Sequence, residues 1–442
     1  MKWPIMVAFG VIAFAVTATA ADTCDSPAAK KNVAWAKSRP HSWLADVEHK
    51  QYVELPRTWC HIWETGGADR IQKAIDFGRV LFTGDGLHPS VGGIVPGSGF
   101  AGGLTYNLER ASASRPLRYS GSVEARGSYN GFWTAGGKLD IWGSENTRDD
   151  RHIHSTVDLE HYELPQLAYF GLGNFSSVAN KSLFGLSQTT GGVDIEVPLP
   201  AGFFLIGDLA GLHNSQSGIH GVSAPSIFTP LNTPGLAVDT THLVAGGSID
   251  WIYPVAPRMR GFSSSLSVGY RLFHATNGPY SFRRLDTSWQ NRYSAAIKNV
   301  DLGTISATAG FVEAYAPAGN SIPFYLQPTI GGTDINNADV LRSYADYRFR
   351  APNLLTLQTE YEHTIWGPLA VLGFHDVGRV FDQRSDIEIA HMRHSFGAGL
   401  ILQVGNLPMV KFYYAWGGSE GTHTTYTLNT NNFTFSTPAG VF

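Results

Sequence analysis

The chain has 442 residues, of which 43% are hydrophobic and 15% are charged, and its formal net charge is −4 at pH 7. This nearly neutral balance, without a basic tract, excludes a nucleic-acid-binding surface of the usual electrostatic kind. The 49 glycines, 18 tyrosines and 25 phenylalanines suit alternating membrane strands better than a soluble α/β enzyme.

Residues 1–20 have the pattern of a cleaved signal peptide. Lys2 supplies the positive start, residues 5–16 are apolar, and Ala18-Thr19-Ala20 is a small-residue cleavage site. A membrane anchor is the alternative, but this apolar segment is too short for a bilayer of about 30 Å. Beyond it the sequence contains no apolar run long enough for a membrane-spanning helix.

Residues 21–95 are expected to form a short, partly helical periplasmic extension that precedes a barrel over residues 96–442. Apolar side chains recur at near-helical spacing in residues 68–82, which predicts one short helix in otherwise irregular chain. Cys24 and Cys60 are the two cysteines of the chain. In an exported protein they could form a disulfide, and two free thiols are the alternative.

From about residue 98 onward, apolar and polar side chains alternate with a period of two. In residues 262–272, for example, Phe262, Val268 and Tyr270 share one face and Arg271 lies on the other. A soluble β-sandwich also alternates, but ions on the polar face and aromatic side chains on the other favour a membrane barrel. Such a sheet must close to pair its backbone. At about 20–22 residues for each strand and its connection, the sequence predicts an all-β, antiparallel transmembrane barrel of about 16 strands.

One arginine stands out late in the chain. Arg342 follows a segment rich in glycine and asparagine, and inward-facing acids are expected on the next two strands at Glu360, Glu362 and Asp376. A guanidinium buried in the lumen requires carboxylate partners, because an unpaired buried ion costs several kcal/mol. The pattern therefore favours an inner loop held by Arg342 against Glu360 and Asp376. Ordinary lumen charges solvated by water are the alternative.

The motifs around this arginine occur in a specific order. They are Leu341-Arg342-Ser343-Tyr344, then Glu360-Tyr361, then Phe374-His375-Asp376-Val377-Gly378, preceded by Pro323–Gly332 and Tyr169–Asn174. Together, over about residues 164–442, they resemble the bacterial surface antigen family of outer-membrane barrels, to which BamA, TamA and the two-partner secretion transporters belong. The resemblance implies that Arg342, Tyr344, Glu360 and Asp376 form an inner-loop lock. Separately, the chain ends in an alternating aromatic segment with a terminal Phe442, which resembles the strand-end signal read by the outer-membrane insertion machinery.

The chain departs from the family in two respects. Ser343 stands where the family has glycine, so the loop tip is expected to be less able to adopt a positive φ. The family's insertases and transporters carry periplasmic POTRA modules that receive the client. Residues 21–95 are long enough for one module, but no βααββ pattern is legible in them.

The function implied by the resemblance is non-enzymatic, without a cofactor, in the outer membrane of a Gram-negative bacterium. The barrel would insert other proteins into that membrane or transport them across it, with outer-membrane lipids and unfolded outer-membrane or secreted proteins as partners. The alternative is a pore, a lipid-handling protein or a structural surface antigen without insertase activity.

Enzymatic and metal-binding interpretations have little support in the sequence. His152, His154 and His161, with Glu160 beside them, have the residue types of a metal site, but the neighbouring charges indicate a solvated loop. The segment Gly97-Ser98-Gly99 lacks the spacing of a nucleophile elbow and predicts a turn. No catalytic and no metal-ligating residues are therefore predicted.

Overall fold

The computed structural model describes residues 84–111, 117–143, 152–216, 223–254, 261–297, 300–336, 338–366, 369–404, 407–418, 420 and 422–428, together with residues 34, 49, 53, 54 and 80–82. The expected signal peptide, the cysteines Cys24 and Cys60, most of the helix expected at residues 68–82, and Phe442 lie outside the described residues.

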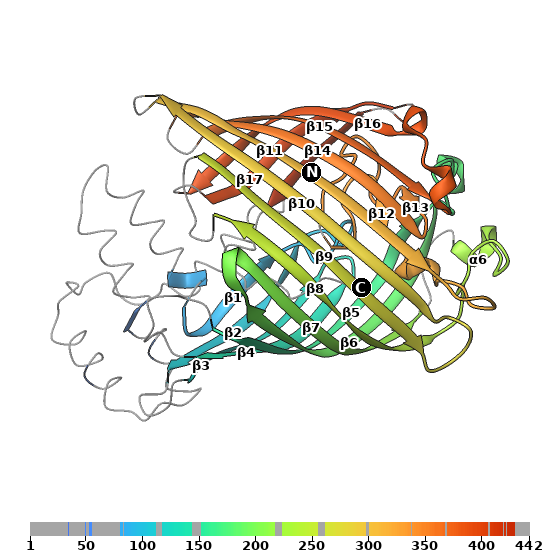
Figure 1. The fold of residues 1–442 in the computed structure, drawn as a ribbon, viewed down its shortest axis with the longest axis horizontal. Helices are drawn as coiled ribbons and strands as arrows, with labels where there is room; N and C mark the ends of the chain where they lie inside the picture. The colour runs from blue at the N-terminus through green and yellow to red at the C-terminus, as the bar shows by residue number, and fades with distance from the viewer. Residues whose placement is uncertain are drawn as a thin grey trace. The chain divides into compact units, whose positions relative to one another are not determined.

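The described residues form one sheet of sixteen strands, ordered β1 to β11 and then β14 to β18 (Figure 1). From β3 to β11, each strand pairs antiparallel with the next. Strand β11 then pairs with β14, and the antiparallel pairing continues from β14 to β18. The expected number of about 16 strands is therefore confirmed. The strands are β1 (Gly86–Gly92), β2 (Ala101–Ala111), β3 (Leu117–Ser128), β4 (Trp133–Gly143), β5 (His154–Tyr169), β6 (Ser182–Pro198), β7 (Phe203–Ser215), β8 (Thr240–Tyr253), β9 (Gly261–Ala275), β10 (Phe282–Ile297), β11 (Val300–Tyr315), β14 (Asn353–Trp366), β15 (Leu369–Phe381), β16 (Arg393–Val404), β17 (Leu407–Trp416) and β18 (Thr422–Leu428).

The remaining elements lie in the connections between these strands. A second, two-stranded sheet pairs β12 (Thr329–Ile330) with β13 (Phe349–Arg350). The helical elements are α6 (Ala224–Ile227) and the 3₁₀ turns η2 (Val178–Asn180), η3 (Pro200–Gly202), η4 (Phe324–Leu326), η5 (Arg384–Asp386) and η6 (Ile389–His391). In the part of the chain that the structure describes, no helix is both long and apolar enough to cross a bilayer.

The chain divides into two compact units. The smaller comprises Met1–Ser90 with Leu104–Glu109, and the larger comprises Val91–Gly103 with Arg110–Phe442. In the smaller unit, the His88 ring contacts the carbonyl oxygens of Gly84 at 2.7 Å and Leu81 at 3.1 Å, and the Glu109 amide donates to Asp85 Oδ1 at 2.8 Å. The functional site described below lies in the larger unit.

Strand β1 begins earlier than the sequence indicated, in a segment for which irregular chain was expected. Its buried positions are Gly86, His88, Ser90 and Gly92, which alternate with partly buried ones. Leu87, Pro89 and Val91 lie on the other face, so apolar and polar residues do alternate, but the segment is only seven residues long and contains a proline, which weakens the signal of a strand in the sequence.

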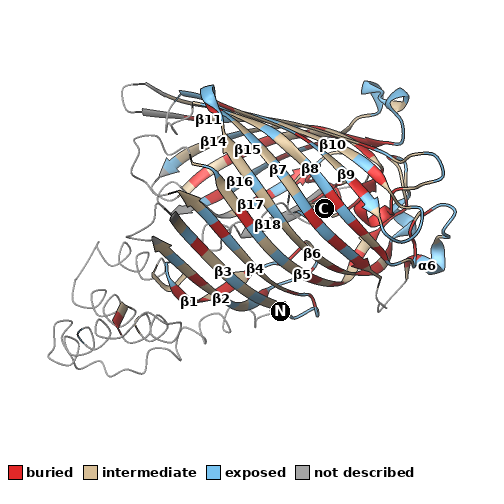
Figure 2. Ribbon diagram, turned by 60° about the horizontal axis from the view of Figure 1, so that its bottom comes forward, coloured by how far each residue is buried: buried red, intermediate tan, exposed pale blue. Residues whose placement is uncertain are grey.

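Burial in the larger unit follows the expected period of two. Exposed and buried positions alternate along the strands (Figure 2). On β9, Phe262, Val268 and Tyr270 are 39–49% exposed on the outer face, while Arg271 points to the interior and its Nε lies 3.2 Å from Asp208 of β7. Apolar and aromatic side chains outside, with ions inside, are the arrangement that a membrane barrel requires.

The long connection between β11 and β14 is the feature that positions the functional site. Residues 316–352, here called the inner loop, fold back so that Phe324, Leu341, Tyr344 and Phe349 are at most 1% exposed. Part of the loop joins a large apolar cluster that includes residues of β5, β6, β9 and β10. Another part packs with Val380 of β15. A connection of this length is held in place by packing against the interior of the strands.

Candidate functional site

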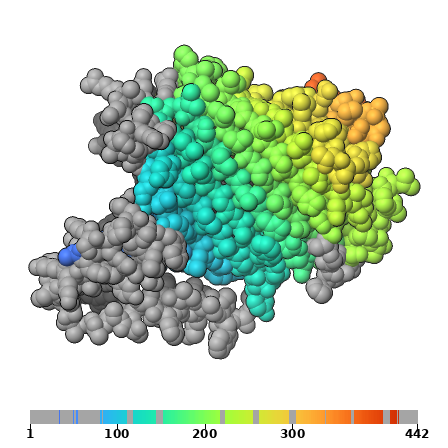
Figure 3. Space-filling view, turned by 90° about the horizontal axis from the view of Figure 1, so that it is seen from below, coloured from blue at the N-terminus to red at the C-terminus, as the bar shows by residue number. Residues whose placement is uncertain are grey.

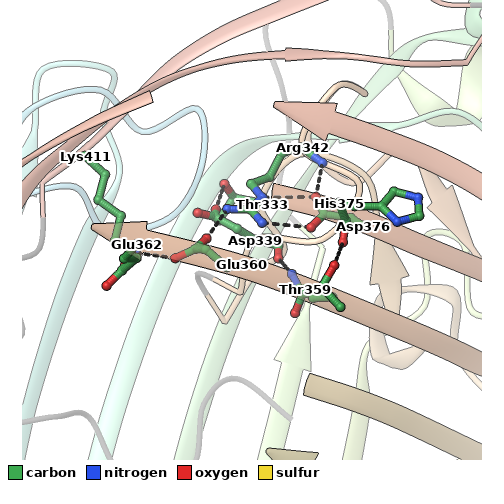
Figure 4. A network of polar contacts seen from close by, with 10 residues as sticks. Thr333, Asp339, Arg342, Thr359, Glu360, Glu362, His375, Asp376 and Lys411 are labelled. Carbon is green, nitrogen blue, oxygen red and sulfur yellow. Dashed lines mark hydrogen bonds and ion pairs between the residues drawn. The ribbon is translucent and has the colours of Figure 1, made fainter. Parts of the chain in front are cut away.

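Arg342 at the centre of the inner loop meets two carboxylates of the wall (Figure 4). Its Nε and Nη2 donate to Oδ2 and Oδ1 of Asp376 on β15 at 3.0 and 2.8 Å. Its Nη1 donates to Glu360 Oε2 on β14 at 2.7 Å, and its backbone amide donates to Asp376 Oδ2 at 3.2 Å. The structure thus brings together Arg342, Glu360 and Asp376, which the sequence placed in one group.

This contact is buried on both sides. The side chain of Arg342 is 5% exposed and that of Asp376 is 0% exposed. A two-bonded guanidinium–carboxylate pair fixes both distance and orientation. Removing one partner of a buried pair costs about 3–5 kcal/mol, because the other charge is left uncompensated.

The charge of Arg342 is secured by the same contacts. Burial acts to lower the pKa of the guanidinium, but the hydrogen bonds and charges of Asp376 and Glu360 outweigh it and raise the pKa above its ordinary value. The arginine is therefore a permanent cation in the site.

An aromatic face completes the arginine pocket. The Cζ of Arg342 lies 3.4 Å from the ring centre of Phe374 and 5.7 Å from that of Tyr413, which favours the cation further. Phe374 lies against Gly397 on β16, where a Cβ would overlap the ring. A glycine at this position therefore makes room for the aromatic side chain that contacts Arg342.

Lys411 of β17 extends the site. Its Nζ lies 3.0 Å from Glu360 Oε1 and 3.0 Å from Glu362 Oε1. Glu360 therefore bridges Arg342 and Lys411, so that the wall from β14 to β17 is joined through one carboxylate. No motif in the sequence marks Lys411 as part of the site. Its position on the inward face of an alternating strand was the only signal available.

The residues after Arg342 contact the connection that follows β17. The Ser343 amide donates to Ser395 Oγ at 2.8 Å and the Ser343 hydroxyl donates to the Gly417 carbonyl at 3.4 Å. Tyr344, 1% exposed, packs so closely on Gly418 (φ +69°) that a Cβ there would overlap its hydroxyl. Tyr344, predicted as part of the lock, thus contacts a neighbouring connection and not the two acids.

The expected consequence of Ser343 is corrected by the backbone. Among the non-glycine residues of the inner loop, the positive φ angles belong to Leu341, at 55°, and Tyr347, at 59°. Ser343 does not have a positive φ, so replacing the family's glycine introduces no left-handed strain at that residue.

A second buried arginine joins the inner loop to other connections, and no motif in the sequence marks it. Arg348 is 2% exposed and donates from Nε and Nη2 to Glu420 at 2.7 and 2.6 Å. Its Nη1 donates to Ser176 Oγ at 2.8 Å and its Nη2 to the Ser176 carbonyl at 2.6 Å. This side chain therefore joins the β5–β6 connection to the β17–β18 connection through the inner loop.

The upstream motif Tyr169–Asn174 also contacts the inner loop, which itself contains the other upstream motif, Pro323–Gly332. The Gly173 amide donates to the Arg350 carbonyl at 2.7 Å, and Arg350 Nη1 donates to the Phe324 carbonyl at 2.6 Å. Tyr169 packs on Phe324 with ring centres 4.8 Å apart. Segments that appear unrelated in the sequence thus form one packed layer around the loop.

The histidines considered for a metal do not converge. His154 Nε2 lies 3.0 Å from Asp140 Oδ1, whereas His161 Nδ1 bonds Thr189 Oγ1 at 2.8 Å and lies on the other face of β5. Among the described residues, no group of three or more His, Cys, Asp or Glu side chains is arranged to hold a metal ion.

Comparison with known proteins bears on the fold. No protein-family model matches the chain, and no curated protein matches it. Among solved structures, BamA from Haemophilus ducreyi lacking POTRA domains 1–3 is similar with a TM-score of 0.53 and 13% identity, over 77% of this chain and 69% of that one. CdiB from Acinetobacter baumannii (10% identity, TM-score 0.46) and CdiB from Escherichia coli (12%, 0.45) match 77% of this chain. The matches span 58% and 62% of the two CdiB chains, less than two thirds of each.

The fold and the site together define an antiparallel outer-membrane-type β-barrel with a loop folded into its interior. More particularly, the barrel has the fold of BamA. The resemblance to the bacterial surface antigen family, expected from the ordered motifs, is confirmed at the level of the fold.

Proposed function

We propose that this chain is a non-enzymatic barrel of a Gram-negative outer membrane that assists the insertion or translocation of other proteins. Its clients would be unfolded outer-membrane or secreted chains. The observation that carries the proposal is the clamp of Arg342 on Glu360 and Asp376, which fixes the inner loop to two adjacent strands. In this role Arg342, Tyr344, Glu360 and Asp376 act as an inner-loop lock.

The physical argument concerns what the lock makes possible. A client that inserts at the seam between the first and last strands requires the wall to loosen there without collapse of the interior. Bonds from the inner loop to β14, β15 and, through Lys411 and Glu360, to β17 keep the wall beside that seam attached to the loop. Charge-assisted hydrogen bonds suit this attachment because they are strong and also specify the geometry of the contact.

An open diffusion pore is less well supported. Apolar side chains of the inner loop, Phe324, Tyr325 and Leu326, pack with Tyr169 and Phe184 in one buried cluster. Phe324 lies 4.8 Å from both Tyr169 and Phe184, measured between ring centres. Close packing of this kind opposes free passage of water and solutes along the interior.

The organisation of the rest of the chain belongs to the same proposal. Residues 1–20 would be a signal peptide, 21–95 a periplasmic extension whose last part supplies β1 (Gly86–Gly92) to the sheet, and 96–442 the rest of the barrel. Phe442 would be read by the insertion machinery during the chain's own assembly. A possible Cys24–Cys60 disulfide would lie in the extension. A βααββ fold of an isolated 21–95 fragment, observed by NMR, would support delivery of clients to the barrel.

The function is tested by depleting the chain in its host and measuring the abundance of all outer-membrane proteins. We expect other barrels or secreted clients to decline, and the wild-type gene supplied in trans to restore them. If every other outer-membrane and secreted protein keeps its abundance after depletion, the insertion and translocation proposal is wrong.

A further inference from the structure

The outer face of the strands carries a polar boundary at one end of its apolar band. On β5, Leu159 is 62% exposed and His161 follows on the same face; on β7, Leu209 is 57% exposed and His213 is the next large side chain on that face. On β8 the order runs from exposed Leu243 to Thr241. In each strand the polar residue lies toward the end from which the inner loop leaves β11. Figure 3 shows the surface of these strands, from teal to yellow.

These polar residues form one row across neighbouring strands. His161 is the register partner of Thr189, Thr189 of His213, and His213 of Thr241. The row repeats one contact: His161 Nδ1 lies 2.8 Å from Thr189 Oγ1, and His213 Nδ1 lies 2.9 Å from Thr241 Oγ1. Two histidine–threonine pairs of the same geometry thus occupy four adjacent strands, and each threonine orients its imidazole ring.

The orientation leaves a specific chemistry at the surface. Because Nδ1 is engaged by the threonine hydroxyl, Nε2 is the ring nitrogen available to a group outside the protein. Nε2 can donate a hydrogen bond in the neutral tautomer in which Nδ1 accepts from the threonine hydroxyl, and also in the imidazolium. On β9 and β10 the exposed His274 and Arg283 lie near the same end but outside the row, since their register partners are Leu243 and Leu272. Glu163 lies two residues beyond His161, so the row is not uniformly basic, but donors outnumber acids along it.

We propose that this histidine–threonine row binds the phosphate groups of lipid headgroups in the membrane leaflet at the inner-loop end. The hydrocarbon of the leaflet would cover the apolar band below the row, and headgroup phosphates would meet the row itself. Phosphate accepts several hydrogen bonds and carries the charge that imidazolium and guanidinium complement. The inference rests on the proposed membrane location, but not on any action upon client proteins.

The test uses the full chain, folded into vesicles of phosphatidylcholine alone or of phosphatidylcholine with phosphatidic acid, and then extracted in mild detergent. The measured quantity is the phosphatidic acid that remains bound to each folded barrel. We expect the double variant His161→Gln/His213→Gln to retain several-fold less phosphatidic acid than the wild type. The double variant Thr189→Val/Thr241→Val keeps both imidazole rings but removes the hydroxyls that orient them. We expect its loss of bound phosphatidic acid to be intermediate.

The matched control is His363→Gln. His363 is an outward histidine of β14, stacked on Tyr361 with ring centres 6.3 Å apart, near the opposite end of the strand. The His363→Gln variant should retain as much phosphatidic acid as the wild type. Retention by the double histidine variant equal to the wild type would overturn the inference, as would an equal loss in all three variants. Failure of the wild type to enter either kind of vesicle would instead remove the membrane location on which the inference rests.

Discussion

The Nη2 of Arg342 lies 2.8 Å from Oδ1 of Asp376, and no part of the Asp376 side chain reaches solvent. One residue belongs to a connection and the other to the wall, 34 positions apart in the sequence. A carboxylate at this depth is tolerated only because the guanidinium neutralises it. The two residues therefore depend on each other, and the stability of the barrel should reflect this dependence.

Arg342→Ala leaves Asp376 buried without a cation. We expect the free energy of unfolding to fall by about 3–5 kcal/mol, and the folded, fast-migrating form on gels to be lost at a lower temperature. Arg384→Ala is the control, because Arg384 is 71% exposed and pairs with Glu313 at the surface. Equal heat resistance of Arg342→Ala and Arg384→Ala would show that the buried pair contributes nothing.

Gly397→Ala should act on Arg342 at a distance. The added Cβ overlaps the Phe374 ring and forces that ring away from the guanidinium, at a cost of about 1–3 kcal/mol for overpacking. Gly207→Ala is the matched control, since a Cβ there meets nothing within 4 Å. Adding Phe374→Leu to Gly397→Ala should recover part of the heat resistance. If Gly397→Ala unfolds at the wild-type temperature, the close packing of Phe374 is not required.

Lys411→Met should destabilise the barrel because Glu360 and Glu362 lose their shared cation. The further change Glu362→Gln removes one of the two neighbouring negative charges and should restore part of the loss. Chemical unfolding of the four proteins of this double-mutant cycle gives the coupling energy between Lys411 and Glu362. If the effects of the two changes on the free energy of unfolding simply add, Lys411 and Glu362 are not coupled and the bridge is contradicted.

Arg348→Gln should release the connection that contains Glu420 without unfolding the wall. The expected result is faster proteolysis within residues 417–421 while the heat resistance of the barrel changes little. Glu420→Gln should have a smaller effect, because it leaves the two bonds from Arg348 to Ser176 intact, and adding it to Arg348→Gln should change nothing further. If this connection in Arg348→Gln resists proteolysis as well as it does in the wild type, the Arg348–Glu420 contact does not hold the connection in place.

The sequence was informative where a motif and a strand period agreed. Arg342, Glu360 and Asp376 could be grouped because inward acids are readable from alternation and the motifs occur in a fixed order. Lys411 could not be assigned to Glu360, because the pair joins strands that are not adjacent and depends on the curvature of the wall. Arg348 had no such motif, and its partner Glu420 lies in another connection 72 residues away.

The backbone conformation of the inner loop could not be predicted from the sequence either. Ser343 suggested strain where a glycine was expected, whereas the non-glycine residues with a positive φ in this loop are Leu341 and Tyr347. Which residue adopts a positive φ in a long connection is decided by the packing around it. Leu341 packs with Val380 of β15, and Tyr347 packs in the large apolar cluster. Local composition alone does not contain that information.

The most direct test of the central proposal is complementation of the depleted host by Arg342→Ala, by Arg384→Ala and by the wild type at matched amounts of folded barrel. Outer-membrane and secreted proteins are then quantified. We predict that wild type and Arg384→Ala restore the depleted proteins and that Arg342→Ala does not. Full restoration by Arg342→Ala would contradict a role for the inner-loop lock in assembling or translocating clients.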